Sequence, residues 1–86
     1  MYYVYLLKSL KDLKLYIGYT KDVDARFEKH NSGRIRSTKH RRPLKLVYFE
    51  AYRTKMEAKE RERRLKHYGK TYAQLKKRIK KSIDSA

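Results

Sequence analysis

Cysteine and tryptophan are absent from this 86-residue sequence, which also has only one proline and three glycines. Without cysteine, neither disulfides nor thiolate metal sites can hold the fold, as suits a reducing compartment. No run of 18 apolar residues occurs, and the opening MYYVYLLKSL lacks the basic segment and cleavage pattern of a signal peptide. We therefore expect a soluble cytoplasmic protein without a membrane partner. Its length predicts one small domain over residues 1–83, with a C-terminal tail at residues 84–86.

Acidic residues are also scarce, since nine Asp and Glu stand against 25 Lys and Arg, for a formal net charge of +16. Such a field concentrates polyanions near the protein and makes their binding depend on salt. DNA is therefore the expected partner, without excluding RNA. A membrane surface is the other anionic partner to consider, with LKKRIKKSI at 75–83 as a basic amphipathic helix. The tyrosine-rich strands and the lack of a wide apolar face argue against it.

Two short segments rich in aromatic and β-branched residues, 2–7 and 15–19, predict an antiparallel hairpin with SLKD as its loop. If Lys8 faces Leu13, Tyr5 lies opposite Tyr16. Directly opposed residues project from the same face of a sheet. Two phenol side chains are therefore expected side by side.

The polar segment that follows predicts a helix, capped at its N-terminus by Thr20 and ended by Asn-Ser-Gly at 31–33. Val23 and Phe27 form its inward stripe. Arg26 and His30, one turn apart, border that stripe and are expected to lie beside the sheet.

The next segment, GRIRSTKHRRP, has few apolar residues and predicts an exposed basic loop. A third strand is expected at residues 44–52. Contacts from the loop to nucleic-acid phosphates are expected from five side chains, Arg34, Arg36, Lys39, Arg41 and Arg42.

A carboxylate appears on the apolar side of the second predicted helix. Thr54 and Glu57 form a capping box that opens this helix, which should run to about residue 68. Glu62 lies four residues after the inward Ala58 and three before the inward Leu65. An unpaired charge there would be costly, so Glu62 needs a cation.

A last helix is predicted from a second capping-box pattern, Thr71 with Gln74. Its inward residues would be Tyr72, Leu75, Ile79 and Ile83.

Five separated elements together resemble the GIY-YIG nuclease domain: YVY at 3–5, YIG at 16–18, Arg26, His30, and Glu62 within EAKERERRLK. They agree with the family in type, order and spacing, and the chain resembles its small stand-alone bacterial members in size. The resemblance implies an α/β (α+β) domain with a three-stranded antiparallel sheet flanked by helices, in the order ββαβαα.

The resemblance also implies an endonuclease that hydrolyses DNA phosphodiester bonds with one divalent ion, Mg²⁺ or Mn²⁺. Tyr16 would orient or deprotonate the attacking water, and Tyr5 would assist it. Arg26 would neutralise charge on the phosphoryl oxygens, and His30 would transfer a proton or bind phosphate. Glu62 would hold the metal, and a lone carboxylate can suffice because Mg²⁺ keeps most of its waters.

Gly18, the glycine of YIG, would let the strand backbone pass close to the site, as the resemblance implies. The chain departs from the family pattern in three places. Tyr19 stands directly after YIG, where several members carry a polar or basic residue that could contact a phosphate. Tyr3 replaces the first glycine of GIY, at a position that mainly contributes a strand. Many members also have an asparagine well after the glutamate, where this chain offers Gln74. We interpret Gln74 as the partner of Thr71 in a capping box rather than as an active-site amide.

Simpler explanations exist for each residue alone. Tyr5 and Tyr16 suit ordinary half-buried strands, and Arg26 is a natural salt-bridge partner for Glu62. The rival function is a non-catalytic basic module that binds nucleic acid. Such a module needs the charge but no metal, so metal dependence separates the two functions.

Overall fold

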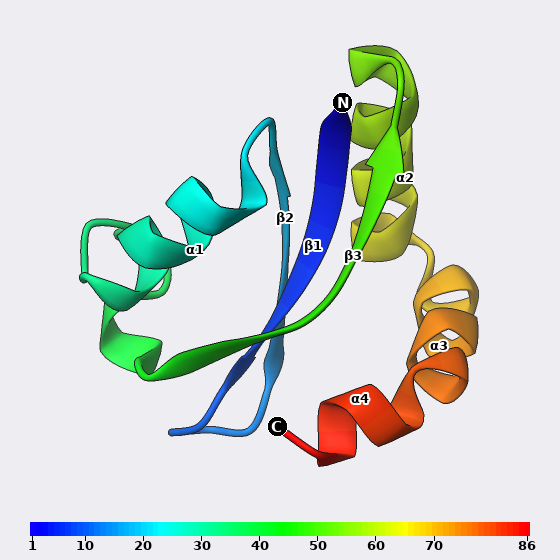
Figure 1. Ribbon diagram of the computed structural model, residues 1–86. Coiled ribbons are helices and arrows are strands. Elements are labelled where there is room, and N and C mark those ends of the chain that lie inside the picture. Colours follow the sequence, from blue (N-terminus) through cyan, green and yellow to red (C-terminus); the bar gives the residue numbers. More distant parts are fainter.

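The computed structural model describes residues 1–86 and contains one sheet and four helices (Figure 1). The elements are β1 (Tyr2–Ser9), β2 (Leu15–Thr20), α1 (Val23–Asn31), a 3₁₀ turn (Lys39–Arg41), β3 (Leu44–Tyr52), α2 (Lys55–His67), α3 (Gly69–Arg78) and α4 (Lys80–Asp84). The expected α+β class and the order ββαβαα are confirmed, with the short α4 continuing from α3. None of the helices is long and apolar enough to cross a membrane.

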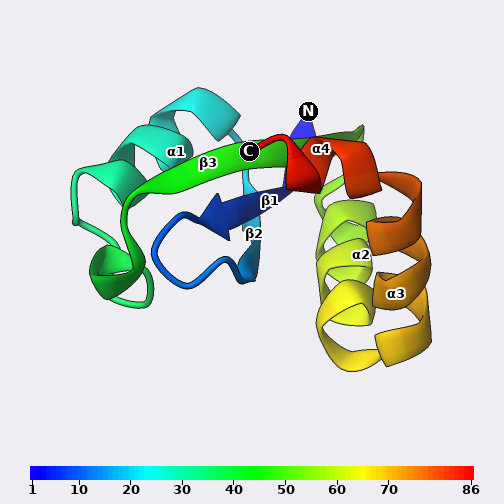
Figure 2. The same ribbon diagram turned by 90° about the horizontal axis from the view of Figure 1, so that it is seen from below.

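The sheet is antiparallel throughout, with strand order β2-β1-β3. Helix α1 lies on one side of the sheet, and α2, α3 and α4 lie on the other (Figure 2). The central strand β1 is therefore covered on both faces, and Val4, Leu6 and Leu7 have no exposed surface.

Alternation along β1 divides the apolar residues between two clusters. Val4 and Leu6 face α2 and α3, where they join the predicted inward residues of those helices. Tyr5 and Leu7 face α1 and pack with Leu44. The cluster on the helical side consists of Val4, Leu6, Ala58, Leu65, Leu75 and Ile79. One face of β1 thus builds most of the core, and the other carries Tyr5 toward α1.

The predicted hairpin register is wrong by two residues. Tyr5 pairs with Gly18, and Tyr16 pairs with Leu7. The loop is longer than SLKD because its own side chains stabilise a wider turn. The hydroxyl of Ser9 accepts the backbone N–H groups of residues 11 and 12, and Asp12 accepts that of residue 14. A shift of two residues keeps the same face of the strand, so Tyr5 and Tyr16 still share a side.

Two of the predicted helix starts are also wrong. Asp22, not Thr20, caps α1, and its carboxylate accepts the backbone N–H of Ala25. Helix α3 begins at Gly69, so Thr71 and Gln74 lie inside it and form no capping box. Helix α3 starts two residues before the predicted cap, Thr71, because only one extended residue, Tyr68, separates it from α2.

Other boundaries are as expected. Strand β3 spans the predicted residues 44–52. Thr54 caps α2 by accepting the backbone N–H of Glu57, and Gly33, which follows the end of α1, has a positive φ of 79°. The C-terminal helix α4 is attached to the sheet by Lys8 of β1, whose ammonium donates to the carbonyl of Ile83 at 2.9 Å.

Candidate active site

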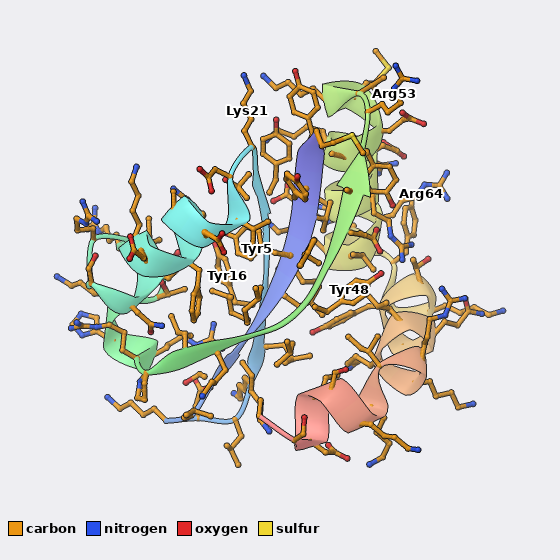
Figure 3. All side chains as sticks on the ribbon, in the orientation of Figure 1. Tyr5, Tyr16, Lys21, Tyr48, Arg53 and Arg64 are labelled. Atoms are coloured by element: carbon orange, nitrogen blue, oxygen red, sulfur yellow. The ribbon has the colours of Figure 1, made fainter.

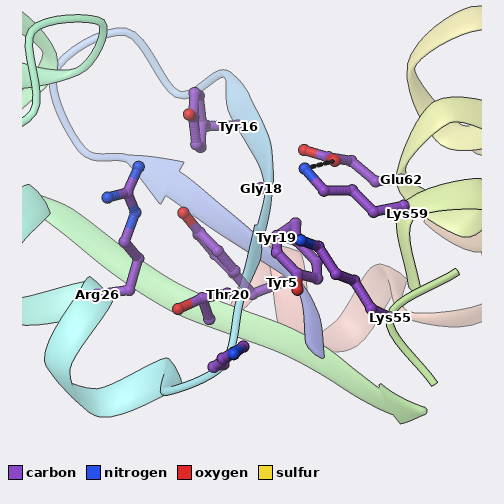
Figure 4. Close-up of a pocket in the computed structure, with 10 residues that line it drawn as sticks. Tyr5, Tyr16, Gly18, Tyr19, Thr20, Arg26, Lys55, Lys59 and Glu62 are labelled. Carbon is purple, nitrogen blue, oxygen red and sulfur yellow. Dashed lines mark ion pairs between the residues drawn. The ribbon is translucent and has the colours of Figure 1, made fainter. Parts of the chain in front are cut away.

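A cleft of about 500 Å³ opens between α1 and α2, along the free edge of β2 (Figures 3 and 4). Four of the five residues predicted to be catalytic line it, and His30 does not. The lining residues are Tyr5, Tyr16, Gly18, Tyr19, Thr20, Lys21, Arg26, Lys55, Lys59 and Glu62. In Figure 4, Arg26 approaches from one side and Glu62 from the other, with the two phenols between them.

The two tyrosines are held together by the sheet and by Gly18. The rings of Tyr5 and Tyr16 have centroids 6.4 Å apart. The Tyr5 ring lies directly over Gly18, where an added Cβ would be 2.3 Å from the ring carbon Cζ and from the hydroxyl. Only glycine leaves room for this ring, so the glycine of YIG fixes where the Tyr5 hydroxyl can lie.

His30 lies beneath the cleft floor, with no exposed surface. Its Nε2 is 2.8 Å from the Tyr5 hydroxyl, and its Nδ1 is 2.6 Å from the hydroxyl of Thr38, which is also fully buried. The imidazole is also edge-on to the Tyr16 ring, at 5.1 Å between centroids. His30 therefore reaches the cleft through Tyr5, and its expected direct contact with phosphate stays a prediction.

Burial, and to a smaller extent the charge of Arg26, lowers the pKa of His30 to about 4 from 6.5. His30 is therefore neutral at pH 7. Below pH 6.5 the unfolded chain gains a proton that the folded chain refuses until about pH 4, so acid favours unfolding. The stability contributed by the neutral imidazole is complete above pH 6.5 and is lost as the pH falls toward 4.

We expect acidification from pH 7 to pH 4.5 to lower the free energy of unfolding by about 2–3 kcal/mol through His30 alone. Urea denaturation across this range measures it. His30→Gln keeps a side-chain N–H but cannot titrate, so its stability should vary less with pH by that amount. Carboxylates titrate equally in both proteins and cancel. Parallel pH profiles for the two proteins would contradict a buried neutral His30.

Arg26 brings an unsatisfied donor to the cleft. Its Nε is buried without a hydrogen-bond partner, and so is the hydroxyl of Tyr19, another residue of the cleft. Buried polar groups are normally paired, so the unpaired Nε is a feature that an oxygen acceptor bound at the Arg26 guanidinium would satisfy. Burial raises the pKa of Tyr5 above its usual value, and Arg26 opposes that rise. Tyr5 is therefore protonated at neutral pH.

Glu62 projects from α2 toward the cleft, and 15% of its side chain is exposed. Its carboxylate accepts from Lys66 at 3.0 Å and lies 3.9 Å from Lys59. The alternative salt bridge between Arg26 and Glu62 does not form. The lysines supply the cations that a carboxylate on this stripe requires.

A hydrogen-bond network beside Glu62 attaches α2 to the sheet. Glu50 on β3 accepts from Tyr48, Tyr52 and Arg61, the last at 2.6 Å. Burial first, and then the Glu50 hydrogen bond, raises the pKa of both tyrosines to about 12. Because Arg61 precedes Glu62 on the helix, this network also fixes the position of Glu62.

Glu62 is the one carboxylate among the residues that line the cleft, so a divalent cation bound there would have Glu62 as its protein ligand. No group of three or more His, Asp or Glu side chains that could hold a metal occurs. Mg²⁺ often takes only one or two carboxylates and completes its shell with water and substrate phosphate. The residues therefore fit a metal that binds together with its substrate.

The sequence did not predict that three lysines line the cleft, namely Lys21, Lys55 and Lys59. Their local signal was only the general abundance of basic residues, and the fold alone brings them to Arg26. Gln74 lies elsewhere, in a depression on α3 beside Arg61 and Arg78.

Some of the basic side chains in the loop have partners within the protein and are not free to bind phosphate. Arg41 forms an ion pair with Asp12 at 3.0 Å, and Arg42 donates to the carbonyl of Lys39 at 2.9 Å. Arg36 and Lys39 are exposed and form no ion pair. Phosphate contacts from the loop stay a prediction, with Arg36 and Lys39 as its best-placed cations.

The sequence matches the GIY-YIG catalytic domain over residues 1–77. It is similar to UPF0213 proteins of Staphylococcus aureus. Those of strains Mu3 and Mu50 are each 53% identical over 68 residues, which cover 78% of this chain and 82% of the relative. The solution NMR structure of the UPF0213 protein BH0048 from Bacillus halodurans has a TM-score of 0.54 and 42% identity, covering 87% of this chain and 82% of that chain. Since the family match extends over nearly the whole chain, the protein belongs to the GIY-YIG catalytic domain family, which its two strand motifs already resembled.

Proposed function

We propose that this protein is a metal-dependent endonuclease that hydrolyses DNA phosphodiester bonds. Membership of a nuclease family makes a nucleic acid the expected substrate. The observation that carries the proposal is the unpaired, buried Nε of Arg26 in a cleft that also holds two phenols and one carboxylate. A phosphodiester supplies the oxygen atoms that this arrangement lacks.

The scissile phosphate fits between Arg26 and the opposite wall. Arg26 donates to the non-bridging oxygens and stabilises the charge that builds on them during in-line displacement. Lys21, Lys55 and Lys59 surround the cleft with positive charge, which attracts the DNA backbone and compensates adjacent phosphates.

The phenols act on the attacking water. Tyr16 lines the cleft and is only partly buried, so its phenol can orient the water, and as a phenolate it would take the water's proton and become the neutral phenol. Tyr5 is held by His30 and by the lack of a side chain at Gly18. Its hydroxyl is therefore in a fixed place to assist Tyr16 by donating to the phosphate or to the water.

Glu62 would hold the divalent ion on the wall opposite Arg26. When bound, such an ion polarises a phosphoryl oxygen and supports the leaving oxygen as a Lewis acid. Lys59 and Lys66 pair with this carboxylate in the free protein. For the ion to bind, both ammonium groups would have to leave Glu62 and pair with DNA phosphates.

The test is direct. Purified protein is incubated with duplex, branched and single-stranded DNA in Mg²⁺, Mn²⁺ or EDTA. We expect strand cleavage in Mg²⁺ or Mn²⁺ and none in EDTA. Absence of cleavage on all substrates and in both metals would remove the proposed activity.

The alternative is a basic module that binds nucleic acid without cleaving it. One observation favours it: both lysines on Glu62 already neutralise the carboxylate, as a purely structural residue would require. That module would bind DNA equally well in EDTA and never cut it.

The exposed part of the basic loop should contribute affinity that does not depend on sequence. We expect the double change Arg36→Ala and Lys39→Ala to weaken binding to unrelated DNA sequences alike and to reduce the slope of log K against log salt by about 2. Lys70→Ala with Lys77→Ala on α3 removes the same charge on the far side of α2 from α1 and is the control. Equal slope changes in both proteins would show that the loop has no special contact with DNA.

A further inference from the structure

Thr38 is the least expected member of the buried group beneath the cleft. It lies in the loop after α1, eight residues from His30, and has no exposed surface. Its hydroxyl oxygen is 2.6 Å from His30 Nδ1, and this is the hydroxyl's one side-chain hydrogen bond. His30 connects in turn to Tyr5, so a continuous buried series runs from Thr38 to the cleft.

Hydrogen atoms can be placed in this series in two ways. A neutral imidazole has one N–H donor and one acceptor nitrogen, and a threonine hydroxyl has one hydrogen. If Nδ1–H donates to Thr38, the hydroxyl hydrogen of Thr38 is left buried without an acceptor. If Thr38 donates to Nδ1, that hydrogen is paired and only a lone pair of the oxygen stays free.

The two arrangements differ in free energy, because a buried donor without a partner loses the hydrogen bond that it makes to water in the unfolded chain. The arrangement in which Thr38 donates avoids this cost. It requires the proton of His30 to be on Nε2. The Nε2–H then donates to the Tyr5 oxygen, since these atoms are 2.8 Å apart.

We infer that Thr38 is a positioning residue that holds His30 in its Nε2–H tautomer and so aims the hydroxyl hydrogen of Tyr5 into the cleft. With His30 as donor, Tyr5 cannot donate to it. Its own hydrogen must point away from the imidazole, toward the cleft that it lines. The Tyr5 oxygen, receiving a hydrogen bond, also becomes a stronger donor. In the other tautomer, Tyr5 would direct its hydrogen inward to His30 and have none for substrate.

This inference deepens the proposed nuclease function and rests on it for its catalytic consequence, but the tautomer itself is measured without substrate. Long-range ¹H–¹⁵N correlation spectra of the full chain at neutral pH report which imidazole nitrogen carries the proton. The chain has three histidines, and His40 and His67 are exposed. The His30 signals are those that vanish in His30→Gln.

Two substitutions at Thr38 distinguish the effect of its hydroxyl group from the effect of its side-chain volume. Thr38→Ser keeps the donor, and Thr38→Val keeps the volume without it. We expect a protonated Nε2 in all three proteins, because an Nδ1–H in Thr38→Val would be a buried donor without a partner. The ¹⁵N shift of Nδ1 should show an accepted hydrogen bond in the parent and in Thr38→Ser and none in Thr38→Val. A parent protein protonated at Nδ1 would overturn the inference, and so would a Thr38→Val spectrum identical to that of the parent.

The catalytic consequence is measured in the same proteins. We expect Thr38→Val to lower kcat by about tenfold, the lower end of the loss found when the hydrogen-bond partner that orients a metal-ligating histidine is removed. Thr38→Ser should recover most of the rate. DNA affinity should be equal in all three, because Thr38 is buried outside the cleft.

Equal loss of kcat in Thr38→Ser and Thr38→Val, with both proteins folded, would show that packing rather than the hydroxyl matters and would overturn the inference. Failure of the parent to cut DNA would instead count against the proposed function. The spectra would still decide the tautomer in that case.

Discussion

Glu62→Gln is expected to abolish metal-dependent cleavage while the protein stays folded and binds DNA at least as well as the parent. The amide keeps the shape of the side chain but is a poor ligand for Mg²⁺, which prefers carboxylates. Loss of one group that stabilises charge in the transition state typically costs on the order of 10²–10³ in rate. DNA affinity should not fall, because a negative charge has left a basic cleft.

Glu60→Gln is the matched control for this measurement. Glu60 lies on the same helix and pairs with Arg63 and Arg64 on the surface, outside the cleft. Its change to glutamine removes the same charge as the change at Glu62. Its cleavage rate should equal that of the parent. Both variants lose ion pairs to lysine or arginine side chains that are themselves exposed, each worth less than about 1 kcal/mol, so neither should melt much earlier.

The contrary result is equally specific. If Glu62 only braces Lys59 and Lys66, Glu62→Gln and Glu60→Gln should cut DNA at similar rates, and the assignment of Glu62 to metal binding would be wrong. Titrating Mg²⁺ and Mn²⁺ over a wide range excludes the case in which the metal merely binds more weakly.

The sequence predicted the site better than it predicted the hairpin. Tyr5 and Tyr16 meet although their predicted pairing was wrong, because side chains alternate along a strand and an error of two residues keeps the face. An error of one residue would have separated them. Glu62 was found because helical spacing from Ala58 and Leu65 is a local property, which short-range patterns record well.

Residues that depend on long-range contacts were not predictable in this way. Thr38 belongs to a basic loop with no apolar periodicity, and only the packed fold brings its hydroxyl to His30. The pairing of Arg41 with Asp12 joins two loops 29 residues apart. Helix starts failed at Asp22 and Gly69 because several nearby residues could each have capped, and tertiary packing selected among them.

Gly18→Ala tests the geometry that the whole site shares. One methyl group at this position would lie 2.3 Å from the Tyr5 hydroxyl and ring, far inside van der Waals contact. Tyr5 is 2% exposed and packed on the α1 side of the sheet, so its ring has little space to move into. Either the two strands separate or the ring leaves its place, and in both cases the hydrogen bond between His30 and Tyr5 breaks.

We expect Gly18→Ala to lower the free energy of unfolding by about 3 kcal/mol, of which overpacking contributes about 1–3 and the lost buried hydrogen bond about 1. Cleavage should fall to background even at temperatures where the variant is folded. Gly69→Ala is the control, because nothing lies within 4 Å of its added Cβ, at the start of α3. There, alanine should leave cleavage unchanged and raise stability by up to about 1 kcal/mol. A Gly18→Ala protein with the stability and activity of the parent would mean that the Tyr5 ring does not lie over Gly18, and the arrangement of both phenols would have to be redrawn.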